Sequence, residues 1–225
     1  DVHLTSDGKV IIWHDNSLER NTNGSGLVEN YTLAQLKQLD AGYTFSPDGG
    51  KTFPFRDKNV RMITLDEALE ECKGQRFNVD LKSKDPKIVK AFTQVIEQHK
   101  AHDRVLCASF HLSHLKRMRV EHPSILTSIT TLEVLQYLIL NTLHLLPKHL
   151  ATDRTIVFQV PIEQWNIKVV TPRFIEEFHK RGAVIMVWTI NEESEMHRLY
   201  DMGVDTLMSD NASLLRQVAL TKNLL

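Results

Sequence analysis

The sequence predicts an α/β fold in which strands and helices alternate, and specifically a (β/α)8 barrel of the TIM type. Short apolar runs alternate with amphipathic stretches along most of the chain. Single helices separate the strands, which is typical of parallel βαβ units. The number of such units favours a closed barrel over an open doubly wound sheet.

The first part of the chain contains few regular elements. It opens in a strand-like pattern, and residues 10–13 are apolar and β-branched, which predicts a strand. Residues 32–39 have helical spacing with Thr32 as N-cap. The stretch 41–60 is rich in turn residues, including the run SPDGG at 46–50. It is too long for an ordinary connection, so we expect an elaborated insert.

Beyond the insert the alternation is regular. Thr64 is a candidate N-cap, Pro172 suits a first helical turn, and Gly203 suits a helix end. The expected strands are residues 77–81, 105–109, 125–128, 156–160, 184–188 and 206–208. The expected helices are residues 65–72, 86–99, 112–120, 132–140 with the segment beyond it, 172–181, 192–202 and 212–220.

The length of 225 residues is compatible with a single large domain. We expect one domain over residues 1–225, with an inserted loop-rich segment at about 15–61. A barrel of this type usually needs about 250 residues. The chain opens directly in a strand pattern, so we expect the first strand-helix unit of the barrel to be missing from this sequence.

The composition gives no sign of a nucleic-acid or membrane partner, although the sequence leaves open that a local charged patch forms in the fold. With 42% hydrophobic residues, 24% charged residues and a net charge of -1, the chain has no overall basic character for nucleic acid. It also has no basic block for a membrane surface and no apolar run of membrane-spanning length. Cys72 and Cys107 are too few for a disulfide scaffold, so both are predicted to be small buried side chains.

Barrel enzymes place their catalytic groups just after the strands. The polar residues at such positions are His14, Asp15, Asp80, Lys82, Ser109, Gln159, Thr189, Asn191 and Asp210. Asp1 precedes a hairpin-like return of the chain to His14.

Four of these residues suggest phosphate chemistry. Asp1 and Asp80 stand on different strands and could hold a hard divalent cation such as Mg²⁺ or Ca²⁺. Lys82 lies two residues after Asp80, so a strand places both on one face. His14 can move a proton near neutral pH. Together they fit attack on a small-molecule phosphodiester.

Each residue also has a structural interpretation. An Asp-x-Lys pair on a strand is often a structural ion pair, and a His-Asp pair at a strand end is often a capped turn. Trp188 suits a core position as well as a substrate wall. The sequence alone leaves these alternatives open.

The segment DVHLTSDGKVIIWHD at 1–15 resembles the glycerophosphodiester phosphodiesterase family, whose pattern is Glu-x-Asp-Val, Thr, Asp-Gly and a later His-Asp. Further segments agree in order over essentially the whole chain. These segments are residues 18–26, 32–40, 63–69, 78–82, 109–110, 159–161, 187–191 and 203–210. The ordered set is specific, although no single piece is decisive.

The resemblance implies a barrel with an insert after its second strand and hydrolysis of glycerophosphodiesters to glycerol 3-phosphate and an alcohol. It assigns metal binding to Asp1 and Asp80, a phosphate contact to Lys82, and acid–base catalysis to His14. It also implies substrate contacts by Trp188, as an apolar wall, and by Phe110.

The sequence departs from the family pattern in four places. It contains neither the family's His-Arg-Gly-Glu motif, with a second catalytic histidine, nor the Glu two places before Asp1. We expect residues upstream of this sequence to supply both, so that this chain alone is inactive and the activity belongs to the intact protein. Asp80 replaces the family's usual Glu, and residues 211–213 lack a proline often found there.

Three rival functions follow from the same residues. A lysophospholipase D shares the motifs but acts on lipid diesters and needs an apolar groove. A non-catalytic barrel would bind phosphate compounds without hydrolysing them. An aldolase-like barrel is disfavoured, because no lysine is isolated in an apolar pattern.

Overall fold

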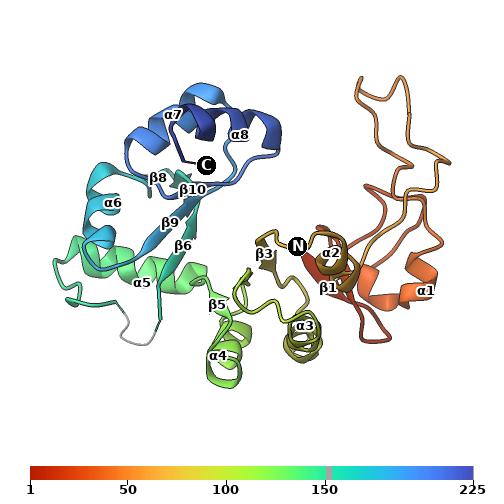
Figure 1. Cartoon of the computed structure of the whole chain (residues 1–225), viewed down its shortest axis with the longest axis horizontal. Coiled ribbons are helices and arrows are strands. Elements are labelled where there is room, and N and C mark those ends of the chain that lie inside the picture. The colour runs from red at the N-terminus through yellow and green to blue at the C-terminus, as the bar shows by residue number, and fades with distance from the viewer. Residues whose placement is uncertain (151–153, 225) are drawn as a thin grey trace. The chain divides into compact units, whose positions relative to one another are not determined.

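A computed structural model describes residues 1–150 and 154–224, and the chain divides into two compact units, Asp1–Thr130 and Thr131–Leu225 (Figure 1). Each unit contains a small parallel sheet with helices packed beside it.

The first unit opens with an antiparallel hairpin of β1 (Val2–Leu4) and β2 (Val10–Ile12). Gly8 stands in the turn with φ of 77°, a left-handed conformation that costs glycine least. Its amide donates to the carbonyl of Thr5. The hairpin confirms the predicted return of the chain from Asp1 toward His14.

The parallel sheet of this unit contains β3 (Phe77–Asp80), β4 (Val105–Ala108) and β5 (Leu126–Thr127), in that order. The connecting helices are α3 (Lys87–Gln98) and α4 (Leu112–Glu121). Strand β1 joins the end of β3 through a parallel bridge between Val2 and Leu81, and the amide of Lys82 donates to the carbonyl of Val2. This register brings the start of the chain beside the end of β3.

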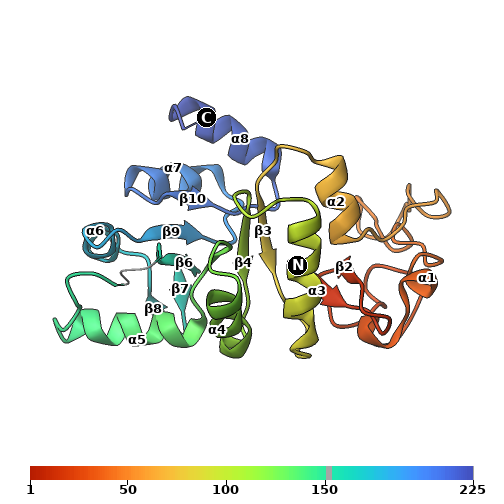
Figure 2. The same cartoon turned by 60° about the horizontal axis from the view of Figure 1, so that its bottom comes forward.

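One hydrophobic core holds the hairpin and the sheet together. Helix α3 runs alongside the strands (Figure 2). It buries Ile88, Val89, Phe92 and Ile96 completely, at the spacing of one helical face. Each such side chain stabilises the fold by about 1.5–3 kcal/mol, so this face fixes α3 against the strands.

The segment between β2 and β3 includes residues 15–61, where the insert was expected. It contains the short helices η1 (Val28–Asn30) and α1 (Leu33–Leu36), and it ends at α2 (Leu65–Glu71). Thr32 and Thr64 are the N-caps of their helices, as predicted, and each also forms a capping box. Within the described residues, 37–63 contain no helix or strand, which agrees with a loop-rich insert.

The insert has a core of its own. Ile11, Leu18, Val28, Leu36 and Met62 are buried together. The remaining loop is held by polar contacts, among them two backbone amides that donate to the buried carboxylate of Asp40. The insert is therefore an ordered part of the first unit.

The second unit contains a parallel sheet in the order β10-β9-β6. Its strands are β6 (Val157–Val160), β9 (Val184–Val187) and β10 (Thr206–Leu207). Its helices are α5 (Thr131–Thr142), α6 (Pro172–His179), α7 (Glu193–Asp201) and α8 (Ala212–Thr221). Its core includes the rings of Phe158, Phe174 and Phe178, which contact one another in tilted and edge-to-face arrangements.

The structure corrects some sequence-based expectations. The described strands form separate sheets within the two units, and no closed barrel is seen among them. A hairpin of β7 (Glu163–Gln164) and β8 (Ile167–Lys168) was not predicted, because residues 163–168, EQWNIK, contain no apolar run. The expected helical continuation beyond residue 140 ends at Thr142. Cys72 is exposed at the end of α2, whereas Cys107 is buried as predicted.

No helix in the described part of the chain combines the length and apolar character needed to cross a lipid bilayer.

Candidate active site

Lys82 lies between two carboxylates at the end of β3. Its Nζ is 2.9 Å from Oδ2 of Asp80 and 3.1 Å from Oδ1 of Asp1. The alternation of a strand directs Asp80 and Lys82 to the same face, and the bridge from β1 to Leu81 brings Asp1 to that face. Three residues expected in the site are therefore in direct contact.

The position of Asp1 depends on buried polar contacts of the hairpin. The amide of Leu4 donates to Oγ of Ser83 at 2.7 Å, and Ser83 is buried. Together with the bond from Lys82 to the carbonyl of Val2, this contact attaches β1 to the segment after β3. The acidic side chain at the start of β1 is thereby held against Lys82.

Asp80 has an unusual environment for a carboxylate. Its side chain is 18% exposed, and its Oδ2 forms an ion pair with Nζ of Lys82. Its other oxygen, Oδ1, is buried and has no hydrogen-bond partner. A buried carboxylate oxygen without a partner is costly, and a bound cation is one way to satisfy it.

His14 stands at the edge of this group. Its Nε2 lies 3.9 Å from Oδ2 of Asp1, and its Nδ1 lies 2.7 Å from Oδ1 of Asp15. The imidazole is 65% exposed, so a ligand can reach it from solvent. Nε2 thus faces the carboxylate of Asp1, and Nδ1 is held by Asp15.

Asp15 is itself held by Arg20. Nε of Arg20 donates to Oδ2 at 2.5 Å, and Nη2 donates to Oδ1 at 2.8 Å. These bonds, and then the one from His14, hold the pKa of the Asp15 carboxyl well below its usual range. The carboxylate is therefore ionised at neutral pH.

Cys107 lies next to this site on β4, where it pairs in register with Val79. Burial raises the pKa of its thiol far above the usual range, and the charge of Asp80 adds to the effect. A thiol in this state is not a nucleophile, which leaves Cys107 a packing role.

The two expected substrate contacts fall in different units. The ring of Phe110 follows β4 in the first unit; its centroid is 5.2 Å from Nζ of Lys82, and the residue is 59% exposed. Trp188 follows β9 in the second unit, where it is half-buried, and its amide donates to the carbonyl of Val160. Phe110 thus offers an apolar surface directly beside the lysine.

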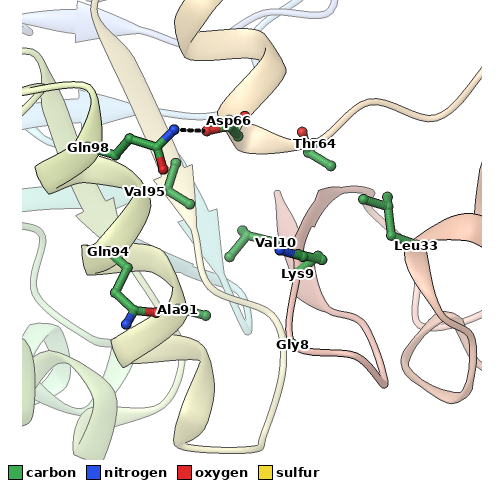
Figure 3. A pocket seen from close by; sticks show the side chains of 10 residues that line it. All are labelled: Gly8, Lys9, Val10, Leu33, Thr64, Asp66, Ala91, Gln94, Val95 and Gln98. Carbon is green, nitrogen blue, oxygen red and sulfur yellow. Dashed lines mark hydrogen bonds between the residues drawn. The ribbon is translucent and has the colours of Figure 1, made fainter.

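The first unit also has a pocket of about 400 Å³, and the residues that line it differ from the candidate catalytic residues. It is bounded by the turn of the hairpin, the start of α2 and one face of α3 (Figure 3). Its one carboxylate, Asp66, already accepts bonds from Gln98 and His99. The pocket is therefore separate from the contact group of Asp1, Asp80 and Lys82.

The contact between Asp15 and Arg20 could not be predicted from the sequence. Asp15 stands out by its place after a strand and in the family's His-Asp pattern, and Arg20 only as part of the segment 18–26. An acidic residue followed five positions later by an arginine is a weak signal in a loop. The turn of the insert, in which the amide of Leu18 donates to the carbonyl of Gly26, brings them together.

No group of three or more potential His, Cys, Asp or Glu metal ligands is found among the described residues. The group at Lys82 supplies two carboxylates, from Asp1 and Asp80.

Comparison with known proteins places these residues in a family context. Over 218 residues the chain is 29% identical to a glycerophosphodiester phosphodiesterase of Bacillus altitudinis, covering 93% of this chain and 80% of that protein. Over 241 residues it is 23% identical to a lysophospholipase D of Mus musculus, covering 96% and 74%.

Solved structures share the fold of this chain. The glycerophosphoryl diester phosphodiesterase domain of an uncharacterized Mycobacterium tuberculosis protein superposes with a TM-score of 0.82 at 19% identity, covering 98% of this chain and 86% of that one. An Oleispira antarctica phosphodiesterase in complex with the product sn-glycerol-3-phosphate superposes with a TM-score of 0.76 at 26% identity, covering 97% and 82%.

The model of one protein family extends over most of the sequence. It matches residues 1–214, a range that contains every candidate site residue of both units. With this match, the chain belongs to the glycerophosphoryl diester phosphodiesterase family.

Proposed function

We propose that the protein hydrolyses glycerophosphodiesters to glycerol 3-phosphate and an alcohol, with the help of a divalent cation. The observation that carries the proposal is the contact group of Asp1, Asp80 and Lys82 with His14 beside it. Membership of the family supports the reaction. The product found in the Oleispira antarctica relative supports the same substrate class.

The carboxylates fit a hard divalent cation. Both supply oxygen donors, and the buried Oδ1 of Asp80 has no partner in the protein. Mg²⁺ commonly binds through one or two carboxylates together with substrate phosphates and water, so two protein ligands are compatible with it. Ca²⁺ also prefers oxygen ligands and is the alternative. When bound, the cation would act as a Lewis acid toward the phosphate oxygens.

The side chains of this chain have distinct roles in the proposal. Lys82 offsets part of the negative charge of Asp1 and Asp80, and its ammonium is offered to the phosphoryl group, where negative charge develops during the reaction. His14 transfers a proton at Nε2, the nitrogen that faces the carboxylate of Asp1. Phe110 and Trp188 are proposed to contact the non-phosphate parts of the substrate.

A lysophospholipase D activity is the second candidate. Its specific support is Phe110, an exposed aromatic ring beside Lys82 that could contact an acyl chain. The Mus musculus relative is a lysophospholipase D. Both reactions break the same phosphodiester linkage, so the difference lies in the apolar surface near the lysine.

The closed barrel is also proposed, and it is supported by the likeness of the chain to solved structures of the family. In this proposal the parallel sheets of both units belong to one (β/α)8 domain with the insert after an early strand. A crystal structure of the natural full-length protein would test it, and an open sheet would contradict it.

The function is tested by incubating the natural full-length protein with glycerophosphocholine and, separately, with lysophosphatidylcholine. We expect glycerol 3-phosphate from the first substrate in the presence of Mg²⁺ or Ca²⁺, and none after chelation. Faster cleavage of lysophosphatidylcholine would favour the lysophospholipase. Binding of glycerophosphocholine without cleavage, under any of these conditions, would identify a non-catalytic phosphate-binding protein.

A further inference from the structure

We infer that Asp15 and Arg20 are positioning residues that fix the orientation and the tautomer of His14. The inference rests on the proposed role of His14 as a proton carrier. Both residues lie in segments that resemble the family pattern, but the resemblance assigns no role to either side chain, and the inference depends on their contacts in the structure.

The first step is the contact between Asp15 and His14. Nδ1 of His14 lies 2.7 Å from Oδ1 of Asp15, a short distance for a nitrogen–oxygen hydrogen bond. An ionised carboxylate can only accept hydrogen bonds, so Nδ1 must carry the proton. The neutral imidazole then has its unprotonated nitrogen at Nε2. This is the nitrogen that faces Asp1.

The second step is the contact between Asp15 and Arg20. The guanidinium binds both carboxylate oxygens, through Nε to one and Nη2 to the other. Such two-point contacts fix the plane of a carboxylate more firmly than a lysine could. Asp15 is 21% exposed, so its carboxylate is partly shielded from water. Without Arg20, rotation of the Asp15 side chain would release His14.

The third step connects Arg20 to the insert. Oγ1 of Thr44 donates to the carbonyl of Arg20 at 2.6 Å, so the loop-rich part of the insert holds the arginine backbone. A second contact acts nearby, because Gly26 donates its amide to Glu19 and so closes the turn that carries Arg20. The insert thus supports His14 indirectly, through Arg20 and Asp15.

A merely structural ion pair would have different consequences. Arg20 is 62% exposed, and exposed ion pairs usually contribute little to stability. If the pair only stabilised the turn, its loss would leave the tautomer and the turnover unchanged. If the two residues position His14 instead, their loss changes the tautomer of the imidazole and the turnover, while the free energy of unfolding stays nearly constant.

The experiment uses three variants, Asp15→Asn, Arg20→Ala and Arg20→Lys, with Arg117→Ala as matched control. Arg117 also binds both oxygens of an exposed carboxylate, that of Glu121, and lies outside the site. The tautomer of His14 is read by two-bond ¹H–¹⁵N correlation spectra of the imidazole nitrogens, on the chain itself, at a pH where the ring is neutral. Turnover of glycerophosphocholine is measured on the natural full-length protein.

We expect a protonated Nδ1 in the wild type and a mixture of tautomers in Asp15→Asn and Arg20→Ala. Turnover should fall by about 10–100-fold in both variants with KM little changed, by analogy with the loss of groups that orient catalytic ligands. Arg20→Lys should restore part of the turnover, and Arg117→Ala should match the wild type.

Unchanged tautomer populations in Asp15→Asn and Arg20→Ala would overturn the inference, whatever the activity. If the wild type hydrolyses no diester, the proposed function fails, while the spectra still decide whether Asp15 and Arg20 fix the imidazole. A wild type with Nδ1 unprotonated would also contradict the inference.

Discussion

Lys82 and Asp1 form an ion pair of 3.1 Å between Nζ and Oδ1, although β1 and β3 come from distant parts of the sequence. The parallel bridge from Val2 to Leu81 sets the two strands in register. The same lysine contacts Asp80 from its own strand. One lysine is thereby shared by two carboxylates, which leaves a net negative charge at this place. Four predictions concern this group and other residues of the protein.

His14→Ala is expected to lower turnover of glycerophosphocholine by at least ~100-fold, the usual scale of acid–base catalysis. The fold should persist, because the imidazole is mostly exposed. Steady-state kinetics and circular dichroism check both points, with His102→Ala as a control outside the site. Near-normal turnover in His14→Ala would remove the residue from the mechanism.

Lys82→Met is expected to destabilise the protein by about 1–3 kcal/mol, because two partly buried carboxylates lose their shared cation. Mg²⁺ should then stabilise the variant more than the wild type, since the cation replaces the missing charge. At ~100 times its Kd the ion would contribute about 2.7 kcal/mol. Urea denaturation with and without Mg²⁺ measures this difference, and equal Mg²⁺ effects in both proteins would count against a shared site.

Asp80→Asn is expected to weaken divalent-cation binding by at least ~10-fold, since even outer partners of metal ligands change affinity by about 10–100-fold. Asp80→Glu should retain binding, because it keeps the carboxylate. Titration calorimetry with Mg²⁺ and Ca²⁺ gives the affinities. If Asp80→Asn binds either ion as tightly as the wild type, the buried Oδ1 is not a ligand.

The buried His114 is expected to make the free energy of unfolding decrease at acid pH. Burial lowers the pKa of His114 from its ordinary value, the nearby His111 lowers it further, and the Lys84 backbone and Asp85 act in the opposite direction. Its side chain is buried, and its Nδ1 has no hydrogen-bond partner. The unfolded chain therefore binds this proton more readily than the folded one. The stability from neutral His114 is present above the unfolded pKa of ~6.5 and is lost as the pH falls toward the lowered folded pKa.

The measurement is the free energy of unfolding in urea between pH 5 and pH 7. His114→Gln should lose part of the decrease seen in the wild type, because glutamine does not titrate. His149→Gln serves as control, since that histidine is exposed. Identical pH profiles for His114→Gln and the wild type would exclude His114 as the source.

Much of the local structure could be predicted from the sequence because short-range chemistry decides it. Thr32 and Thr64 are followed three residues later by Gln35 and Glu67, and both sets form capping boxes. The strands after the insert were predicted from their apolar runs. The hairpin β7–β8 was missed because its residues, EQWNIK at 163–168, contain no apolar run.

The contacts of Arg20 and the exposure of Cys72 could not be predicted in the same way. Both depend on where a loop or a helix end is placed by the rest of the unit. Cys72 follows the apolar face of α2 in sequence, but it stands at the helix end, where the backbone leaves the core.

The sequence by itself determined which residue types were available: two acidic residues, a lysine two positions after one of them, and a histidine after a strand. Strand alternation was enough to direct Asp80 and Lys82 to one face. Only the tertiary structure decided that Asp1 joins them and that Arg20 holds Asp15 against His14. The reason is physical, because charge pairs and hydrogen bonds act over a few ångströms. Strand register and the closing of the insert bring distant residues within that range.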